Sequence, residues 1–314
     1  MGSAGLKDDI QFRSFAGPAL MAPTQTIRTE DGRTLRVAEG GDSGGWPLIA
    51  HHGTPACGNL YPAHDRYALE HGIRLIGYDR PGYGGSVRSL GRRVADARGD
   101  VLAIADHLEL ARFSVWGHSG GGPHAIACAA TLPDRVASAA ASGSCAPFEA
   151  GGLDWIAGMG EGNIQEFRAS LEGPEALERF LQPEWNAIRE EEDELPPELR
   201  SLLSPEDFEL LTRELGKYLH SNSRFAVEHA PDGWIDDDLA FVTDWGFDLA
   251  DIRVPTSIWH GRLDRFVPYS HGVWLSQHIP QSEFRLFDQE THLTLFERKF
   301  PEITQWLRTH GQGL

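Results

Sequence analysis

A serine flanked by glycines is the residue of this chain best placed for nucleophilic chemistry. Ser119 lies in the stretch Gly117-His118-Ser119-Gly120-Gly121, between an apolar run that predicts a strand and an alanine-rich run that predicts a helix. A tight strand-to-helix turn exposes a hydroxyl at the carboxyl edge of a sheet and requires neighbours without side chains. The amides that follow then lie at a helix N-terminus, where they can stabilise a negatively charged tetrahedral intermediate. The pattern therefore predicts that Ser119 is a nucleophile.

A glycine-rich turn without a catalytic role is the alternative interpretation of the same residues. The chain contains 35 glycines, so a Gly-x-Ser-x-Gly pattern can also occur by chance. A phosphate-binding turn would need the lysine of a P-loop or Gly-x-Gly-x-x-Gly spacing, and neither accompanies Ser119. The strand and helix patterns on either side favour the nucleophile.

Two further side chains should complete the site, because a serine hydroxyl is a weak nucleophile until a base accepts its proton and a carboxylate orients that base. His292 follows the last predicted strand and precedes the last predicted helix, so it should lie at the same sheet edge as Ser119. Asp264 follows a neighbouring strand in a glycine-containing turn, and Asp288 beside the last strand is an alternative. The sequence predicts a triad of Ser119, Asp264 and His292.

The loop after the first long apolar strand is the second candidate for binding an oxyanion. It reads HHGTP at residues 51–55 and should emerge at the same edge as the serine turn. Alone it would be an ordinary turn shaped by glycine and proline. Beside the serine turn, we expect the backbone N–H groups of Thr54 and Gly120 to form the oxyanion hole. Chemistry of this kind requires neither a metal nor an organic cofactor, and none is expected. The adjacent His51 and His52 lack the usual helical ligand spacing, which disfavours a metal site there.

The elements that must position these residues alternate between strand and helix. An Asp-Gly turn within residues 24–41 predicts an antiparallel hairpin. Helical apolar spacing appears over residues 96–110. Short apolar runs that end in glycine or polar residues predict strands at 47–53, 73–82, 113–119, 135–144, 256–264 and 283–293. Such alternation predicts a mostly parallel sheet with helices on both faces.

The alternation stops between residues 146 and 245, where the sequence becomes acidic and helical. We expect a helical cap inserted into one α/β core formed by residues 24–145 and 246–314, with residues 1–23 as a flexible arm. Further helices are expected over residues 269–279 and 294–310. Aromatic side chains of the cap should mostly be core, with a few lining an apolar substrate pocket. The pocket residues nominated are His118, Trp155, Trp185 and Trp234.

Composition excludes several classes of protein. The 28 basic and 46 acidic residues give a formal charge of -18, which disfavours nucleic acid and anionic lipid surfaces as partners. Three cysteines without Cys-x-x-Cys spacing favour a reducing compartment, and we expect a cytoplasmic protein. No apolar run approaches the length of a membrane span, and the first residues do not resemble a secretory signal.

Taken in order along the chain, these landmarks resemble those of the α/β-hydrolase superfamily. They are the stretches 52–55, 79–86, 117–121 and 261–264, followed by His292. The resemblance implies an eight-stranded, mostly parallel sheet, a helical lid after the sixth strand, and the order nucleophile, acid, histidine. Thr291 stands where the family often has glycine. A serine nucleophile argues against epoxide hydrolases and haloalkane dehalogenases, in which aspartate attacks.

The sequence therefore predicts a serine hydrolase that cleaves carboxylic esters of small, hydrophobic substrates through an acyl-enzyme. Four other activities remain open. A cofactor-free haloperoxidase or perhydrolase, a carbon–carbon bond hydrolase and a lactone hydrolase would all use the same triad. A small-ligand receptor on a hydrolase scaffold would use none of it.

Overall fold

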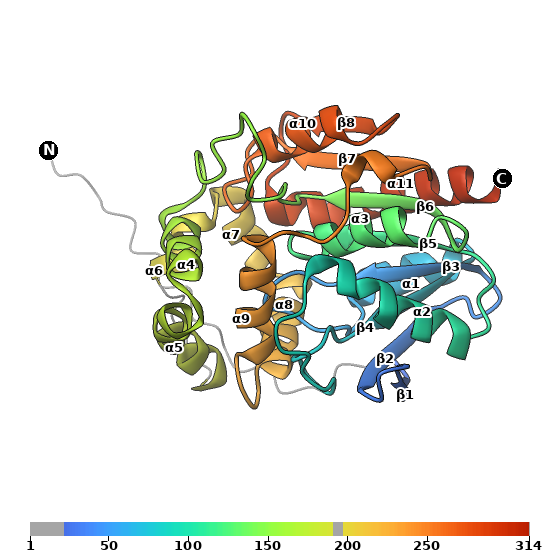
Figure 1. The fold of residues 1–314 in the computed structure, drawn as a ribbon, viewed down its shortest axis with the longest axis horizontal. Helices are drawn as coiled ribbons and strands as arrows, with labels where there is room; N and C mark the ends of the chain where they lie inside the picture. Colours follow the sequence, from blue (N-terminus) through green and yellow to red (C-terminus); the bar gives the residue numbers. More distant parts are fainter. Residues whose placement is uncertain (1–21, 191–196, 314) are drawn as a thin grey trace, which may run out of the picture.

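The computed structural model describes residues 22–190 and 197–313 (Figure 1). Residues 1–21 of the expected flexible arm lie outside this description, as does part of the acidic stretch of the expected cap.

An eight-stranded sheet forms the centre of the molecule, in the order β1-β2-β4-β3-β5-β6-β7-β8. Strand β2 is antiparallel to β1 and to β4, and every other neighbouring pair is parallel. The predicted fold class is confirmed. The strands are β1 (Thr24–Arg28), β2 (Thr34–Gly41), β3 (Trp46–His51), β4 (Ile73–Tyr78), β5 (Phe113–His118), β6 (Val136–Ser142), β7 (Thr256–Gly261) and β8 (Glu283–Phe287).

The predicted hairpin is the pair β1 and β2, in which Arg28 faces Thr34. Gly32 has a φ of 88°, a conformation that glycine adopts without steric penalty. Asp31 accepts hydrogen bonds from the Thr29 hydroxyl and the Arg33 guanidinium, at 2.5 and 2.7 Å. The side chain of Asp31 therefore stabilises the turn that fixes the register of the two strands.

Helices cover both faces of the sheet because successive strand residues point to opposite sides. Ile49 and Val115 pack with residues of α2, α3 and α10 in one core cluster. Leu48 and Trp116, their neighbours along the chain, pack with residues of α1 and α11 in another. These helices are α1 (Pro62–Glu70), α2 (Ala97–His107), α3 (Gly121–Thr131), α10 (Tyr269–His278) and α11 (His292–Gln312), with short 3₁₀ turns at Val94–Asp96 and Leu249–Asp251.

Helix α1 lacks the apolar spacing from which a helix is predicted. Its buried residues are only His64 and Ala68, and the helix begins at Pro62, a residue favoured in the first helical turn. Tertiary packing of His64 between the Tyr61, Phe296 and Phe300 rings takes the place of an apolar stripe.

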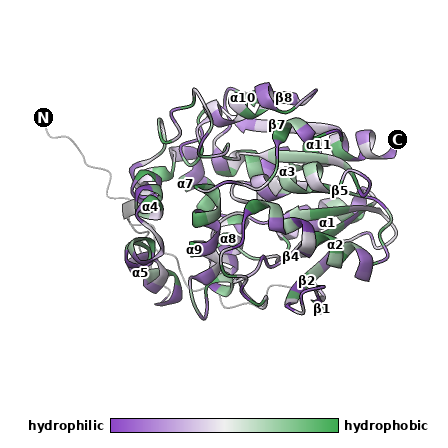
Figure 2. Cartoon of the chain, in the orientation of Figure 1, coloured by the Kyte–Doolittle hydropathy of each residue, from purple (hydrophilic) through white to green (hydrophobic). Residues whose placement is uncertain are grey.

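Among the described residues between β6 and β7, where the sequence predicts a helical cap, six helices are formed. They are called the inserted helices here: α4 (Glu161–Glu172), α5 (Pro174–Glu190), α6 (Pro197–Leu202), α7 (Pro205–Leu211), α8 (Glu214–Ala226) and α9 (Asp232–Phe241). In Figure 1 they lie together on the left, beside one end of the sheet. Figure 2 shows both hydrophilic and hydrophobic residues on α5, and its buried residues Leu177 and Leu181 are four apart, as expected of a helix that packs on one face.

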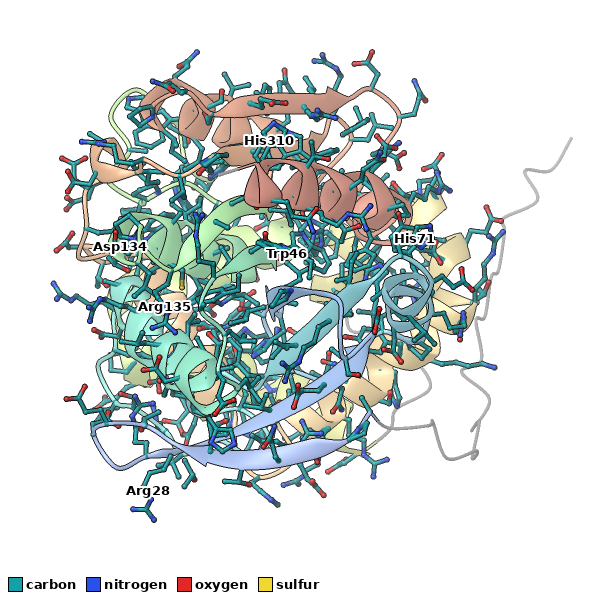
Figure 3. All side chains as sticks on the ribbon, turned by 90° about the vertical axis from the view of Figure 1, so that its right-hand side faces the viewer. Arg28, Trp46, His71, Asp134, Arg135 and His310 are labelled. Atoms are coloured by element: carbon teal, nitrogen blue, oxygen red, sulfur yellow. The ribbon has the colours of Figure 1, made fainter. Side chains whose placement is uncertain are left out.

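The inserted helices lie at the end of the sheet where the parallel strands finish. Figure 3 views the opposite end, where the labelled Trp46 begins β3 and Arg135 immediately precedes β6. In open α/β sheets, ligands bind at the carboxyl ends of the strands.

Cys57, Cys128 and Cys145 are all buried free thiols. Among the helices in the described residues, none combines the length and the apolar composition that a membrane span needs.

Candidate active site

Ser119 occupies a strained turn between β5 and α3. Its φ of 55° lies in the left-handed region, which residues other than glycine rarely adopt. Its N–H donates to the Ser142 carbonyl at 2.9 Å, and its own carbonyl accepts from the Gly122 N–H at 3.0 Å. A Cβ atom at Gly117 would approach the Gly121 carbonyl oxygen to 2.1 Å, so the turn leaves no room for a side chain there. The flanking glycines are a packing requirement of the serine turn.

His292 and Asp264 are joined by a hydrogen bond of 2.7 Å between Nδ1 and a carboxylate oxygen, Oδ2. The other oxygen of Asp264 accepts from the backbone N–H groups of Phe266 and Val267, both at 2.9 Å. The Phe266 ring stacks on the imidazole with its centroid 4.5 Å away. Because Nδ1 faces the carboxylate, Nε2 is the nitrogen that remains to accept a proton.

Ser119 and His292 line the same cavity. The hydrogen bonds among the described residues do not include one between the Ser119 hydroxyl and His292. Contacts of this kind are commonly long in a ligand-free protein and shorten when substrate binds. The structure thus joins two of the three predicted triad residues by a hydrogen bond and brings the third to the same cavity.

Asp288, the alternative acid, lies elsewhere. Its carboxylate is 72% exposed and pairs with the Arg262 guanidinium at 2.7 Å. Asp264 is therefore the carboxylate that contacts His292.

Thr291 forms the N-cap of α11 and thereby fixes the start of the helix that carries His292. Its side chain accepts from the Thr294 N–H at 3.3 Å and donates to Asp207 at 2.5 Å. Asp207 belongs to α7 and also accepts from the Leu293 N–H at 3.2 Å. The residue that departs from the family pattern thus connects the inserted helices to His292.

The two nominated oxyanion donors are close to each other. A Cβ atom at Gly120 would lie 2.3 Å from the Thr54 hydroxyl, and one at Gly53 would lie 3.5 Å from Ser119 Cβ. Thr54, Ser119 and Gly120 also line one cavity together. The loop and the serine turn are therefore adjacent, as an oxyanion hole requires.

A buried ion pair between Arg80 and Asp237 holds the loop that contains Thr54 in place. Arg80 donates to the backbone carbonyls of His52 and Gly53, the latter at 3.0 Å, and to Asp237 at 2.5 Å. Asp237, on α9, also accepts from the Thr54 hydroxyl at 2.7 Å. Burial alone would raise the pKa of Asp237, but Arg80 and Arg92 lower it well below its usual value. The carboxylate therefore stays ionised and holds the Thr54 loop to the inserted helices.

Sequence reasoning missed Asp237. Its only signal is the run Asp236-Asp237-Asp238 in a helix whose other residues are largely apolar, an unusual place for three carboxylates.

The larger cavity, of about 290 Å³, is lined by Ser119, His292 and His118 and by apolar side chains that include Leu60, Ile188, Leu203, Leu219 and Phe296. Burial lowers the pKa of His118 well below its usual value, and the charge of His292 would lower it further. His118 therefore contributes a neutral ring, whose Nδ1 lies 3.1 Å from the Ser142 hydroxyl.

Two of the nominated pocket residues line neither this cavity nor the second one described below. The Trp155 indole donates to the Ala146 carbonyl at 2.7 Å and packs against Phe167, so it is core. The Trp185 indole donates to the Val227 carbonyl at 2.8 Å and so joins α5 to the end of α8. The structure does not place these two rings on either cavity, and apolar composition does not distinguish a core ring from a cavity wall.

Trp234 and Ser119 line the second cavity, of about 90 Å³, which extends among the inserted helices. Thr54 and Phe266 line both cavities, so the two spaces meet at the serine.

Within the described residues, no group of three or more histidine, cysteine or acidic side chains is arranged to hold a metal ion. The rings of His51 and His52 have other partners. His51 Nδ1 lies 3.1 Å from the Tyr78 hydroxyl, and His52 Nε2 accepts from the Arg80 N–H at 3.0 Å.

Comparison with known proteins gives one family match. A family model described as the alpha/beta hydrolase fold matches residues 47–299. The chain is 28% identical over 232 residues to a 2-hydroxy-6-oxononadienedioate/2-hydroxy-6-oxononatrienedioate hydrolase of Cupriavidus pinatubonensis, with 72% of each chain covered. It is 32% identical over 148 residues to a non-heme chloroperoxidase of Streptomyces lividans, which covers 46% of this chain and 54% of that protein.

Among solved structures, a thermophilic esterase from Thermogutta terrifontis matches with a TM-score of 0.66 at 22% identity, covering 92% of this chain and 100% of that one. Identity at this level shows a shared fold and nothing of a shared substrate. The chain spans about half of the chloroperoxidase, and as little as 29% of another curated relative.

Proposed function

The chain belongs to the α/β-hydrolase family, and on that premise we propose that it hydrolyses carboxylic esters of small, mainly apolar molecules through an acyl-enzyme. The observation that carries the proposal is the hydrogen bond between His292 and Asp264 at the wall of the cavity that also contains Ser119.

In this mechanism the Ser119 hydroxyl attacks the ester carbonyl while His292 Nε2 accepts its proton. Asp264 holds the imidazole in the tautomer that leaves Nε2 free, and stabilises the imidazolium that forms. The N–H groups of Thr54 and Gly120 stabilise the oxyanion, each by about 3 kcal/mol in the transition state. His292 then protonates the departing alcohol. A water molecule, deprotonated by the same ring, releases the acid and restores the serine.

The larger cavity supports an apolar acyl or alcohol group. Its walls are predominantly aliphatic and aromatic, and its volume of about 290 Å³ suits a small ligand. The neutral ring of His118 adds no charge to this wall.

Hydrolysis of a carbon–carbon bond is the second candidate. The Cupriavidus pinatubonensis relative, which matches over 72% of this chain, is named a hydrolase of 2-hydroxy-6-oxo dioates. Peroxide-dependent halogenation is a third, since the Streptomyces lividans relative is named a chloroperoxidase. Both would use the same serine and histidine, so the geometry described above does not distinguish them from ester cleavage.

A substrate panel tests the proposal. Purified protein is given p-nitrophenyl esters of two to eight carbons, a lactone, a vinylogous 1,5-diketone, and peroxide with a halide acceptor. We expect kcat/KM to be highest for an ester and to vary with chain length as the cavity fills. Ser119→Ala should abolish the activity, and Ser43→Ala, at an exposed serine, should retain it. A higher kcat/KM for the diketone, or esterase activity that survives Ser119→Ala, would contradict the proposal.

A further inference from the structure

The second cavity contains one buried and one partly buried carboxyl group that the proposed mechanism does not use. Glu166 of α4 and Asp238 of α9 line it, together with Ser119. Among the described residues that line this cavity, none is a lysine, arginine or histidine. Carboxyl groups next to a reaction centre, without a basic side chain in the same wall, favour a bound cation over a bound anion.

Asp238 has an unused acceptor. It is only 2% exposed, and its Oδ2 atom is buried without a hydrogen-bond partner. A buried polar atom without a partner destabilises the fold unless a ligand or water satisfies it. Its neighbour Glu166 already accepts from the Trp234 indole at 2.6 Å, which fixes that carboxyl group against the cavity wall. Glu166 and Asp238 also hydrogen-bond to each other, so the two acids share a proton, and no donor from the other described residues satisfies the Oδ2 atom of Asp238. The geometry therefore presents an acid pair to the same small space.

Aromatic rings form much of the remaining wall of the second cavity. A cation near the face of such a ring is attracted by its quadrupole, and cages of rings with a carboxylate are the usual way in which proteins bind ammonium groups. The rings that line this cavity are Phe167, Phe180, Trp234, Phe241 and Phe266.

We propose that the second cavity binds an ammonium group of the substrate, held by Glu166 and Asp238 among these aromatic rings. This inference rests on the proposed ester hydrolysis and narrows its substrate class. The preferred ester carries an apolar arm in the larger cavity and an arm with a protonated amine in the second one. Because the two cavities meet at Ser119, both arms can be bound while the carbonyl carbon lies at the hydroxyl.

The protonation of the two acids is consistent with a site made for a cation. Burial raises the pKa of Asp238 well above its usual value, and the neighbouring Glu166 raises it further. Burial also raises the pKa of Glu166. In the absence of a ligand the pair therefore retains a proton, and an ammonium group would take the place of that proton.

Isosteric pairs of esters test the proposal, with the charge placed first in the acyl arm and then in the alcohol arm. The first pair is p-nitrophenyl 3-aminopropanoate and p-nitrophenyl butanoate. The second is 2-(dimethylamino)ethyl butanoate and 3-methylbutyl butanoate. We expect the charged member of at least one pair to have a kcat/KM at least 10-fold higher. Equal values in both pairs would overturn the inference and leave the proposed ester hydrolysis intact.

Two isosteric variants test whether the carboxyl groups cause the preference for the charged ester. Asp238→Asn and Glu166→Gln should each bring the ratio within a pair close to one, while kcat/KM for the uncharged ester changes by less than about 3-fold. Glu172→Gln, at an exposed position of the same helix α4, is the matched control and should keep the preference. A preference that survives both carboxyl variants would show that the cation binds elsewhere.

Direct binding keeps the inference testable even if no ester is hydrolysed or a variant fails to fold. Calorimetric titration of the unmodified protein with propylammonium chloride should give binding at least 10-fold tighter than titration with 1-propanol. Absence of that difference would overturn the ammonium site. Absence of ester hydrolysis together with tight propylammonium binding would instead refute the proposed function alone.

Discussion

Asp264 has little freedom to turn, because three hydrogen bonds occupy its two carboxylate oxygens. The N–H groups of Phe266 and Val267 hold one oxygen, and the imidazole of His292 contacts the other. The orientation of the ring is therefore set before any substrate arrives.

Substitution of Asp264 and of Asp288, the alternative acid, tests which carboxylate orients His292. Asp264→Asn should lower kcat for ester hydrolysis by about 10³- to 10⁴-fold, because an amide can hold the imidazole in the wrong tautomer and cannot stabilise its charge. Asp288→Asn removes an exposed carboxylate of the same type and should retain full activity. Steady-state rates of the two variants provide the measurement. Near-normal activity of Asp264→Asn would contradict the assignment.

At the scale of the elements, α9 is connected to the loop that contains Thr54 by a buried ion pair. Asp237 and Arg80 both have side chains that are at most 1% exposed, and neither is among the described residues that line the two cavities. Breaking a buried pair of this kind costs about 3–5 kcal/mol of stability. Asp237 holds Thr54 directly, by accepting from its hydroxyl at 2.7 Å, and Arg80 holds the carbonyls of the two residues before it. On the proposed mechanism, Asp237 is therefore a positioning residue.

Asp237→Asn should therefore lower kcat more than it raises KM. We expect a fall in kcat of about 10-fold or more, approaching the 10²- to 10³-fold loss that follows removal of an oxyanion donor. Asp232→Asn on the same helix is the control, because its partner Arg88 is 33% exposed and that pair contributes little. A variant that loses stability but keeps kcat would reduce Asp237 to a structural role.

Elements were predictable where their apolar pattern is regular. The strands β3 to β7 are short apolar runs with a polar end, and the hairpin follows from Asp31 and Gly32. Helix α1 was missed because aromatic stacking around His64 replaces a stripe of apolar residues. The ammonium site was not predictable either, because Glu166 and Asp238 come together only when α4 packs against α9.

The shared location of the three proposed triad residues was predictable for a different reason. Ser119, Asp264 and His292 each follow a strand of a parallel sheet, and the ends of such strands share one edge. Trp155 and Trp185 had no comparable constraint. Whether an aromatic ring of the inserted helices faces a cavity or a neighbouring helix depends on packing that the sequence pattern does not encode.

For the molecule as a whole, buried neutral histidines couple stability to pH. Burial lowers the pKa of His64 and His124 to about 3, and that of His271 to about 4. In the unfolded chain these rings take up protons below a pH of about 6.5, so acid favours unfolding. Asp100 opposes this in part, because burial raises its pKa to about 6. Between pH 6 and 3.8 the folded state holds that proton more tightly.

The free energy of unfolding should therefore fall as the pH is lowered from 7 to 5. Each such histidine changes the free energy of unfolding by up to about 1.4 kcal/mol for each pH unit. His64→Phe keeps a ring against Phe300 and should reduce the slope by about that amount, whereas His278→Gln at an exposed site should not. Urea unfolding at several pH values measures the slope. An unchanged slope in His64→Phe would mean that this ring is protonated in the folded protein.

Covalent labelling tests the central claim most directly, that Ser119 is a nucleophile primed by His292 and Asp264. The protein is treated with a fluorophosphonate, digested, and analysed by mass spectrometry. We predict one adduct, on the peptide that contains Ser119, which is absent in Ser119→Ala and forms at least 100-fold more slowly in His292→Ala. Rapid labelling of another residue, or no labelling of a protein that still hydrolyses esters, would contradict this account.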